Sequence, residues 1–315
     1  MRVSEYLLYW LKGKKADLQA STYEAYTIYI TKHINPYFDT LGKSLEELKP
    51  IDIKNYVTEK RNSGRKDGKK GGLSSVSVRK HLNIIKQAFR EAVILELVQV
   101  SPADAVRLPH SDSISSQAKF ISIDLANAII KAFEGHALYT LVYVTLMYGL
   151  RRSEVLGLKR SAVDLENQSL TIRHTVVKNL TIEAKDRTKT FSSYRTFPLL
   201  KEVAELLEGI LQDKHPGDYL FSRADGSPLR PDTVTRIFQR VLKAHGIERM
   251  RFHDLRHATA SILFDNGWSV PDVQHWLGHA DIETTMNIYV KYNCTRKLTV
   301  GGALEGLFSG KVKKP

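Results

Sequence analysis

Apolar residues in the first hundred positions of the chain recur at helical steps. Over residues 74–98 they return every three or four positions and form one face, as expected of an amphipathic helix. A capping-box pattern with Ser21 as the cap predicts a helix that ends before Pro36, and residues 50–62 predict another. This part of the chain is therefore predicted to contain helices only.

The second half of the chain begins with two further helical patterns. Ser122 caps a predicted helix that ends at Gly135, and the apolar run 137–150 predicts a buried helix that stops at Gly149. The apolar run has 14 residues, two of them threonines, and is too short to cross about 30 Å of hydrocarbon. No membrane partner is expected.

Three short segments after Asp164 are rich in β-branched or aromatic residues and are separated by polar turns. Residues 169–176, 181–184 and 194–198 predict a three-stranded antiparallel sheet. Helical patterns resume over residues 201–212, 231–244, 253–265, 270–277 and 282–292. The predicted fold class is mainly α with a small antiparallel β-sheet, arranged as a helical domain followed by a mixed α/β domain.

A polar segment with four serines separates these two patterns. Because this segment follows Pro109 and lacks apolar periodicity, we expect a linker at 111–118. The predicted division is a helical domain at 1–110, a mixed domain at 119–292 and a C-terminal tail at 293–315.

Composition adds a strong positive charge to this picture. The 315 residues include 47 Lys and Arg against 34 Asp and Glu, which gives a formal net charge of +13 and favours a nucleic-acid partner. Cys294 is the single cysteine, so an intramolecular disulfide and CxxC zinc modules are excluded. The N-terminus shows no export signal, and we expect a cytoplasmic protein.

Part of the positive charge is concentrated between two predicted helices. Residues 60–72 contain six basic residues, one acidic residue and four glycines, and the next helix begins with two more cations on the face away from its apolar stripe. A solvated surface loop is one interpretation; a cationic surface for DNA phosphates is the other. The candidate DNA-binding residues are Arg65, Lys66, Lys69, Lys70, Arg79 and Lys80.

The first cluster with candidate chemistry follows the buried helix that ends at Gly149. Arg151 and Arg152 come directly after this end, and Glu154 lies three residues after Arg151. The arrangement predicts a partly buried arginine that Glu154 orients. A surface salt bridge near the end of the helix dipole is the alternative.

The second cluster places His253, Arg256 and His257 on one face of a predicted helix, because steps of three and four residues bring side chains together. The two histidines have the spacing of a zinc pair, but neither a HExxH glutamate nor a nearby cysteine accompanies them. Arg256 would repel a dication, whereas histidine and arginine together suit a phosphate. We expect no metal.

The third cluster begins where the predicted helix 270–277 ends at Gly278, which places His279 on a sharp turn. Tyr289 lies ten residues later on the following predicted helix. A tyrosine at such a position is by itself usually an amphipathic core residue.

Taken together and in this order, the motifs GLRRSE, HDLRH and LGH, with a tyrosine ten residues beyond the last histidine, resemble the tyrosine recombinase family of phage and mobile-element integrases. The resemblance covers the chain from residue 3 to about residue 308 and is specific because the motifs occur jointly. It implies a helical core-DNA-binding domain and a catalytic domain.

The resemblance also implies the role of each residue. Arg151 and Arg256 would clamp the phosphate, His253 and His279 would transfer protons and bind phosphate, and Tyr289 would be the nucleophile that forms a 3′-phosphotyrosyl link. Two arginines make a metal unnecessary, and no cofactor is expected.

A catalytic lysine is expected between the second and third predicted strands. Lys189, within the sequence TKTFSSYR, matches the mobile-element version of the family motif, and Lys185 is the alternative. The lysine would act as general acid on the leaving oxygen.

The resemblance further implies the partners. These are double-stranded DNA at the element's ends, other copies of the chain in a tetramer, and an accessory DNA-bending or excision factor, in the nucleoid of a bacterial cell. The apolar segment 303–308 in the tail would dock on a neighbouring protomer. Many such integrases carry a further small N-terminal arm-binding domain, whereas this sequence begins almost directly with the core-binding helices; either this member lacks that domain or it has been removed.

Two other functions fit the same residues. A monomeric nicking-closing enzyme of the type IB topoisomerase kind would share the chemistry, and a non-catalytic DNA-binding regulator would keep only the fold. Tetramerisation on DNA separates the recombinase from the first alternative, and replacement of Tyr289 separates it from the second.

Overall fold

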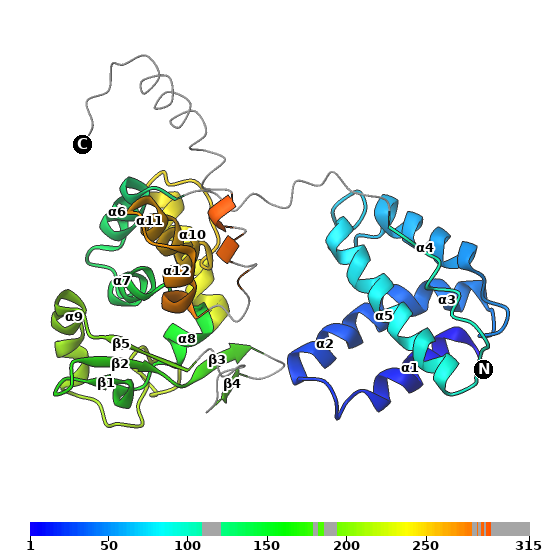
Figure 1. Ribbon diagram of the computed structural model, residues 1–315, viewed down its shortest axis with the longest axis horizontal. Helices are drawn as coiled ribbons and strands as arrows, with labels where there is room; N and C mark the ends of the chain where they lie inside the picture. The colour runs from blue at the N-terminus through cyan, green and yellow to red at the C-terminus, as the bar shows by residue number, and fades with distance from the viewer. Residues whose placement is uncertain are drawn as a thin grey trace, which may run out of the picture. The chain divides into compact units, whose positions relative to one another are not determined.

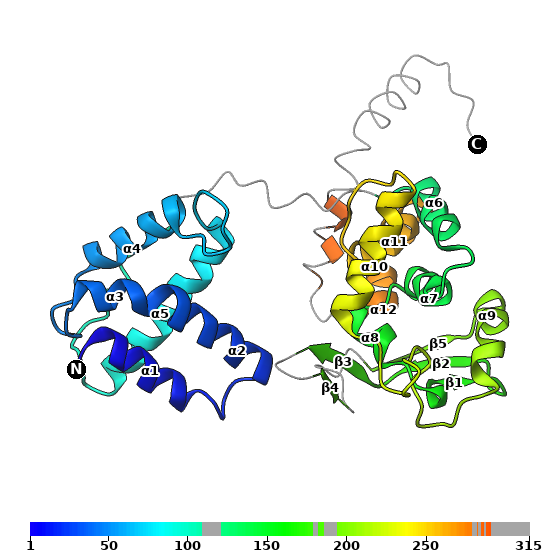
Figure 2. The ribbon, with the colours of Figure 1, turned by 180° about the vertical axis from the view of Figure 1, so that it is seen from behind.

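The computed structural model describes residues 1–108, 121–178, 182–185, 194–278, 282, 285–286 and 288–290. The chain divides into two units, Met1–Ser116 and Gln117–Pro315, which are drawn in Figure 1 and from behind in Figure 2. Each unit buries its own apolar core. The predicted linker at 111–118 and the predicted tail at 293–315 lie outside the described residues.

The first unit is helical, as predicted. Its helices are α1 (Val3–Gly13), α2 (Ala20–Tyr29), α3 (Asn35–Leu41), α4 (Pro50–Ser63) and α5 (Ser75–Ile94). The hydroxyl of Ser74 caps α5 by accepting a hydrogen bond from the backbone N–H of Ser77. The buried face of α5 packs on α1, where the Tyr6 hydroxyl donates to the carbonyl oxygen of Ala88 over 2.7 Å.

The predicted start and end of the second helix were wrong. The α2 helix begins at Ala20 with Gln19 as its N-cap, so Ser21 lies inside the first turn. The chain also stays helical past Pro36, because a π-helical turn at Ile30–Ile34 leads directly into α3. Pro36 falls in the first turn of α3, where proline is tolerated.

The second unit is mixed, as predicted. Its helices are α6 (Ile123–Phe133), α7 (Tyr139–Tyr148), α8 (Arg152–Gly157), α9 (Lys201–Leu211), α10 (Pro231–Ala244), α11 (Asp254–Asp265) and α12 (Val270–Leu277). Residues 282, 285–286 and 288–290 are also helical. Ser122 caps α6 as expected, whereas α8 was not predicted. No helix in the described ranges is long and apolar enough to cross a membrane.

The strands of the second unit form two small antiparallel sheets. The bounds are β1 (Val163–Asp164), β2 (Ser169–Ile172), β3 (Thr175–Lys178), β4 (Ile182–Lys185) and β5 (Arg195–Pro198). One sheet has the order β1-β2-β5, with Thr171 opposite Thr196, and β3 pairs with β4 in the other, with Thr175 opposite Lys185. Both views show the three-stranded sheet beside α9 (Figure 1, Figure 2).

The small three-stranded antiparallel sheet is confirmed, and the structure adds the short strand β1 and a second, two-stranded sheet. The segment 169–176 is divided between β2 and β3 at Arg173 and His174. At this break the end of α8 meets the chain: a Cβ on Gly157 would lie 2.4 Å from the carbonyl oxygen of His174. This contact joins residues far apart in sequence, and alternation within one segment gives no sign of it.

The buried α7 helix organises the end of the second unit where the site forms. It packs against α11, where the Thr259 hydroxyl donates to the carbonyl oxygen of Leu146 over 2.6 Å. It ends at Gly149, whose φ of 59° and ψ of 37° are left-handed and favour glycine. A Cβ on Gly149 would lie 2.3 Å from Cδ2 of Leu277, the last residue of α12. The ends of α7 and α12 therefore meet at a glycine beside α11.

We expect Gly149→Ala to lower the free energy of unfolding by about 2–4 kcal/mol, because alanine adds left-handed strain and a clash with Leu277. Gly135→Ala is the matched control: Gly135 has a similar φ of 73°, but its Cβ would meet nothing within 4 Å. This control should lose only about 1–2 kcal/mol. Urea unfolding of both variants measures the difference, and equal losses would contradict the clash.

Candidate active site

The candidate site forms where several helix ends meet in the second unit. Arg256 lies in the first turn of α11, and its side chain is only 1% exposed. Its Nη1 donates to the carbonyl oxygen of Gly149 over 2.7 Å, and its Nη2 donates to that of Leu277 over 2.6 Å. Both carbonyls stand at helix C-termini, where the helix dipole favours a cation. The guanidinium group therefore joins α11 to the ends of α7 and α12.

Burial changes the acidity of this arginine without removing its charge. Desolvation, followed by the positive charge of Arg151, lowers the pKa of Arg256 to about 9. The group remains protonated near neutral pH. A buried cation with a fixed orientation is suited to stabilise an anion that enters the site.

Arg151 is the N-cap of α8 and faces the same region. Its backbone N–H donates to Oε2 of Glu154 over 2.8 Å, and its Nη1 donates to Oε1 over 2.6 Å. Its Nη2 donates to the carbonyl oxygen of Gly278 over 3.1 Å. The side chain is 31% exposed and that of Glu154 is 1% exposed, so the structure brings the two together as a partly buried pair rather than as a surface salt bridge.

Glu154 is shared with an arginine that the sequence did not single out. Arg195, at the start of β5, donates from Nη1 to Oε1 of Glu154 over 3.2 Å and from Nη2 to Oε2 over 2.9 Å. Burial alone would raise the pKa of Glu154, but the charges and hydrogen bonds of Arg195 and Arg151 outweigh it and lower the pKa to about 2. The carboxylate therefore stays ionised.

A sequence signal for Arg195 did exist. Arg195 and Phe197 are two positions apart in a predicted strand and so lie on the same face of it, and Phe197 is buried. A cation on the core side of a strand needs a buried anion as its partner. The guanidinium carbon lies 5.3 Å from the centroid of the Phe197 ring, and the Arg195 side chain is 9% exposed.

The two histidines of the second cluster lie together at the start of α11. The ring centroids of His253 and His257 are 5.0 Å apart, with the planes at 85°. The His253 side chain is solvent-exposed, yet desolvation by the surrounding protein and then the charges of His257 and Arg256 lower its pKa to about 4. The His253 ring is therefore neutral near pH 7. Among the described residues no three His, Cys, Asp or Glu side chains cluster to hold a metal ion.

Tyr289 lies on the short helical segment 288–290 and is half-buried. Its ring packs on Phe264 of α11, with centroids 5.2 Å apart and an angle of 63° between the planes. The same small cluster contains Val273 and Leu277 of α12. The tyrosine is thus held against the two helices whose ends form the arginine site.

Two other predicted site residues, Lys189 and His279, lie outside the described residues. The alternative lysine, Lys185, is the last residue of β4 and pairs with Thr175 of β3. Its side chain also lies outside the described part of the chain.

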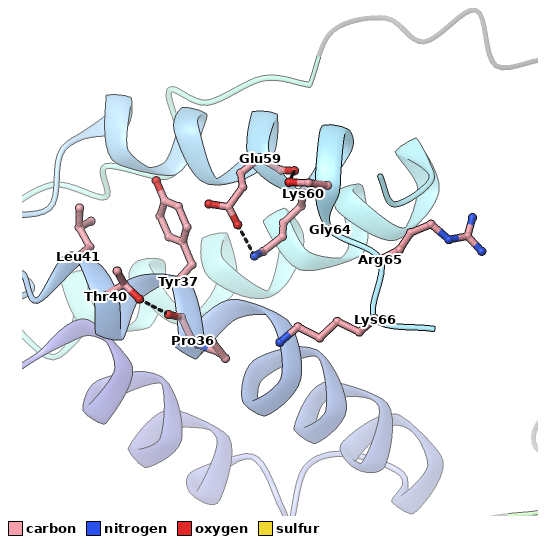
Figure 3. A pocket seen from close by; sticks show the side chains of 10 residues that line it. Pro36, Tyr37, Thr40, Leu41, Glu59, Lys60, Gly64, Arg65 and Lys66 are labelled. Carbon is pink, nitrogen blue, oxygen red and sulfur yellow. Dashed lines mark hydrogen bonds and ion pairs between the residues drawn. The ribbon is translucent and has the colours of Figure 1, made fainter. Parts of the chain in front are cut away.

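The six candidate DNA-binding residues are all exposed in the first unit. Arg65 pairs with Asp67 over 2.6 Å, which offsets its charge. Arg65 and Lys66 border a cavity of about 450 Å³ between α3 and α4. In Figure 3 the Lys66 side chain reaches back across this cavity, whereas Arg65 points away from it. Of the six predicted residues, Arg65 and Lys66 line this cavity.

The wall of this cavity includes a lysine that the sequence reasoning did not select. Lys60 is 7% exposed, and its Nζ donates to Oε1 of Glu59 over 2.7 Å. The ammonium group lies 5.8 Å and 5.4 Å from the ring centroids of Tyr37 and Tyr56. These contacts with described residues indicate a structural role for Lys60 in the first unit.

Comparison with family models matches both units. Residues 119–296 match the phage integrase family, and residues 3–61 match the phage integrase N-terminal SAM-like domain. The first match spans more than half of the chain.

Individual proteins show the same likeness. A tyrosine recombinase XerC-like protein of Caldanaerobacter subterraneus subsp. tengcongensis is 24% identical over 295 residues, covering 85% of this chain and 73% of the relative. The Tn1549 transposon integrase, solved with a circular intermediate DNA, has a TM-score of 0.75 at 18% identity, covering 91% of this chain and 94% of that chain. A lambda integrase tetramer bound to a Holliday junction has a TM-score of 0.66 at 20% identity, covering 89% and 78%.

From the low pKa of the Glu154 carboxylate we expect the stability of the fold to depend on pH. Because the folded-state pKa of Glu154 lies below its unfolded value of 4.5, its contribution to stability is present above pH 4.5 and is lost as pH falls towards 2. Glu154→Gln should cost about 3–5 kcal/mol at pH 7 by leaving two cations without their anion. The deficit should shrink by about 2 kcal/mol between pH 7 and pH 3, because at pH 3 the carboxyl group is mostly protonated in the unfolded chain but still mostly ionised in the folded one.

Urea unfolding between pH 7 and pH 3 measures this deficit. The control is Glu205→Gln, because Glu205 forms an exposed pair with Lys201 over 3.9 Å. This variant should change the free energy of unfolding by less than about 1 kcal/mol at every pH. A deficit for Glu154→Gln that does not vary with pH would contradict the assignment.

Proposed function

This chain belongs to the phage integrase family of tyrosine recombinases, and from that premise we propose how its residues cut and rejoin DNA. The chain is a site-specific DNA recombinase of the mobile-element type, which transfers DNA strands through a 3′-phosphotyrosyl intermediate. The observation that carries the residue assignments is the arginine site, where Arg151 and the buried Arg256 meet at helix ends.

Arg151 and Arg256 are the proposed phosphate clamp. Attack on a phosphodiester adds negative charge to the non-bridging oxygens, and guanidinium groups stabilise that charge with directed hydrogen bonds. The support is positional: Arg256 is fixed by the carbonyls of Gly149 and Leu277, and Arg151 is fixed by Glu154. Because these two cations supply the charge stabilisation, the proposed mechanism needs no metal.

Tyr289 is the proposed nucleophile. Its oxygen forms a bond to phosphorus, the bond from phosphorus to the 5′-oxygen breaks, and the tyrosine proton leaves to a base. His253 suits the base because its low pKa keeps the ring neutral near pH 7. Attack by a 5′-hydroxyl from another strand reverses these steps, so rejoining needs no separate energy source.

The 5′-oxygen leaves as an alcohol and must gain a proton. We assign this proton to Lys189, which lies between β4 and β5 in the sequence, with Lys185 at the end of β4 as the alternative. His279 follows directly after Gly278, whose carbonyl accepts a hydrogen bond from Arg151. This sequence position supports a role for His279 at the phosphate.

The recombinase acts on double-stranded DNA as an oligomer. We assign core-site binding to residues 1–110, with the exposed cations at 65–80 on phosphates, and cleavage to residues 119–292. The finer proposals are a tetramer, exchange of the tail at 293–315 between protomers, an accessory bending or excision factor, and action in the nucleoid. The net charge of +13 supports the DNA surface, and the lambda integrase likeness supports the fold on which such an assembly is built.

The assay for the nucleophile uses nicked duplex DNA from the element's end, which traps the covalent intermediate. The wild-type chain should give an adduct that survives denaturation and EDTA, and Tyr289→Phe should give none while it still binds DNA. Tyr139→Phe, at the far end of α7, is the matched control and should form the adduct normally. No wild-type adduct despite tight DNA binding would favour a non-catalytic regulator.

The two lysine candidates are separated by changing the leaving group. A substrate with sulfur in place of the bridging 5′-oxygen needs no general acid, because a thiolate leaves readily. Lys189→Ala should lose on the order of 10²–10⁴ in cleavage rate on the oxygen substrate and recover on the sulfur substrate. Lys185→Ala should be close to wild type on both. The reverse pattern would assign the acid to Lys185, and a loss of equal size on both substrates would contradict the role.

A further inference from the structure

The buried carboxylate of Glu154 holds arginines from two separate elements. Arg151 binds it from the start of α8, and Arg195 binds it from the start of β5. Each carboxylate oxygen accepts from both residues: Oε1 from the two Nη1 atoms, and Oε2 from the Arg151 backbone N–H and from Nη2 of Arg195. Glu154 can therefore not turn towards one partner without losing contacts to the other.

Among the described residues, this cluster brings three arginines to one carboxylate. If Arg151 alone faced Glu154, the pair would be neutral, and Arg256 would be the remaining cation at the proposed phosphate site. Arg195 adds a positive charge that matches Glu154. Arg256 lies 4.0 Å from Glu154, so the charge of this carboxylate acts on both proposed clamp residues.

Arg195 also fixes the direction of the carboxylate. Its two parallel hydrogen bonds set the plane of the Glu154 head group, which a lysine, with a point charge, cannot do. With Glu154 fixed, Nη1 of Arg151 is held, and Nη2 of Arg151 is left directed at the carbonyl oxygen of Gly278. Both Nη atoms of Arg195 donate to Glu154, so this carboxylate connects Arg195 to Arg151.

We propose that Arg195 is a positioning residue for DNA cleavage: it neutralises and orients Glu154, and so keeps the charge and direction of Arg151 and Arg256 available to the scissile phosphate. This inference rests on the proposed function, in which these two arginines clamp the phosphate. The inference adds Arg195 to the two arginines of the proposed clamp, and it connects the start of β5 to that clamp.

The test compares Arg195→Met, Arg195→Lys, Glu154→Gln and the double variant Arg195→Met/Glu154→Gln. The measured quantity is the single-turnover rate of adduct formation on nicked DNA at saturating protein, with the DNA dissociation constant measured in parallel. Arg223→Met is the matched control, because Arg223 forms an exposed pair with Asp225 over 3.5 Å. Its rate should equal that of wild type.

Arg195→Met should slow cleavage about 10- to 100-fold, within the range for loss of electrostatic stabilisation, with DNA affinity changed less than about threefold. Adding Glu154→Gln removes the carboxylate that would otherwise neutralise Arg151, and should restore the rate at least about threefold. Arg195→Lys should fall between wild type and Arg195→Met, since it returns the charge without the paired hydrogen bonds.

A second substrate separates charge from general damage to the fold. A methylphosphonate at the scissile position replaces one charged oxygen with a methyl group, so the clamp has less charge to stabilise. On this substrate the loss caused by Arg195→Met should shrink to less than about threefold. A merely structural role would slow both substrates equally.

The inference is overturned if the double variant is no faster than Arg195→Met, or if the loss is the same on both substrates. If circular dichroism shows that Arg195→Met is unfolded, the cleavage rates of Arg195→Lys and of the double variant are compared instead. Neither of these variants leaves the Glu154 carboxylate with Arg151 as its main cation. Absence of a wild-type adduct would instead contradict the proposed function. A wild-type adduct with an unchanged rate in Arg195→Met contradicts this inference alone.

Discussion

The second unit depends on one buried cation. Removing a guanidinium group from water is costly unless hydrogen bonds and compensating charge surround it. Arg256 meets this requirement with carbonyl oxygens at the ends of α7 and α12, so both helices must stop at the same place. Gly149 permits this, because its left-handed backbone ends α7 while leaving room for Leu277. The length of each helix and the place of the site are therefore set by the same contacts.

The prediction from sequence succeeded where the signals are local. The bounds of α10 were predicted correctly because Pro231 marks its first turn, and those of α12 because Ser269 caps it and Gly278 ends it. The six-residue α8 was missed because it is too short to show an apolar period. The division of segment 169–176 into β2 and β3 was missed because the chain there passes close to Gly157, a contact that alternation within the segment does not reveal.

The candidate site shows the same limit. Motif resemblance identified Arg151 and Arg256, and the structure brings them to one set of helix ends. The motif TKTFSSYR contains Arg195 but assigned it no role, because its partner Glu154 is 41 positions away along the chain and the pairing exists only in the folded state. A motif records which residue types recur, whereas the charge balance of a buried site depends on every ionised group that folding brings within a few ångströms.

The arginines and the tyrosine are held by different kinds of contact. The arginine site is tied to the main core through α7, β5 and α8, with a buried ion pair and paired hydrogen bonds. Tyr289 belongs to a small satellite cluster on α11 and α12 within the described ranges. The same cluster contains Leu277, whose carbonyl oxygen accepts a hydrogen bond from Arg256. The end of α12 therefore takes part in both kinds of contact, with its side chain in the apolar cluster of Tyr289 and its backbone at the buried guanidinium group.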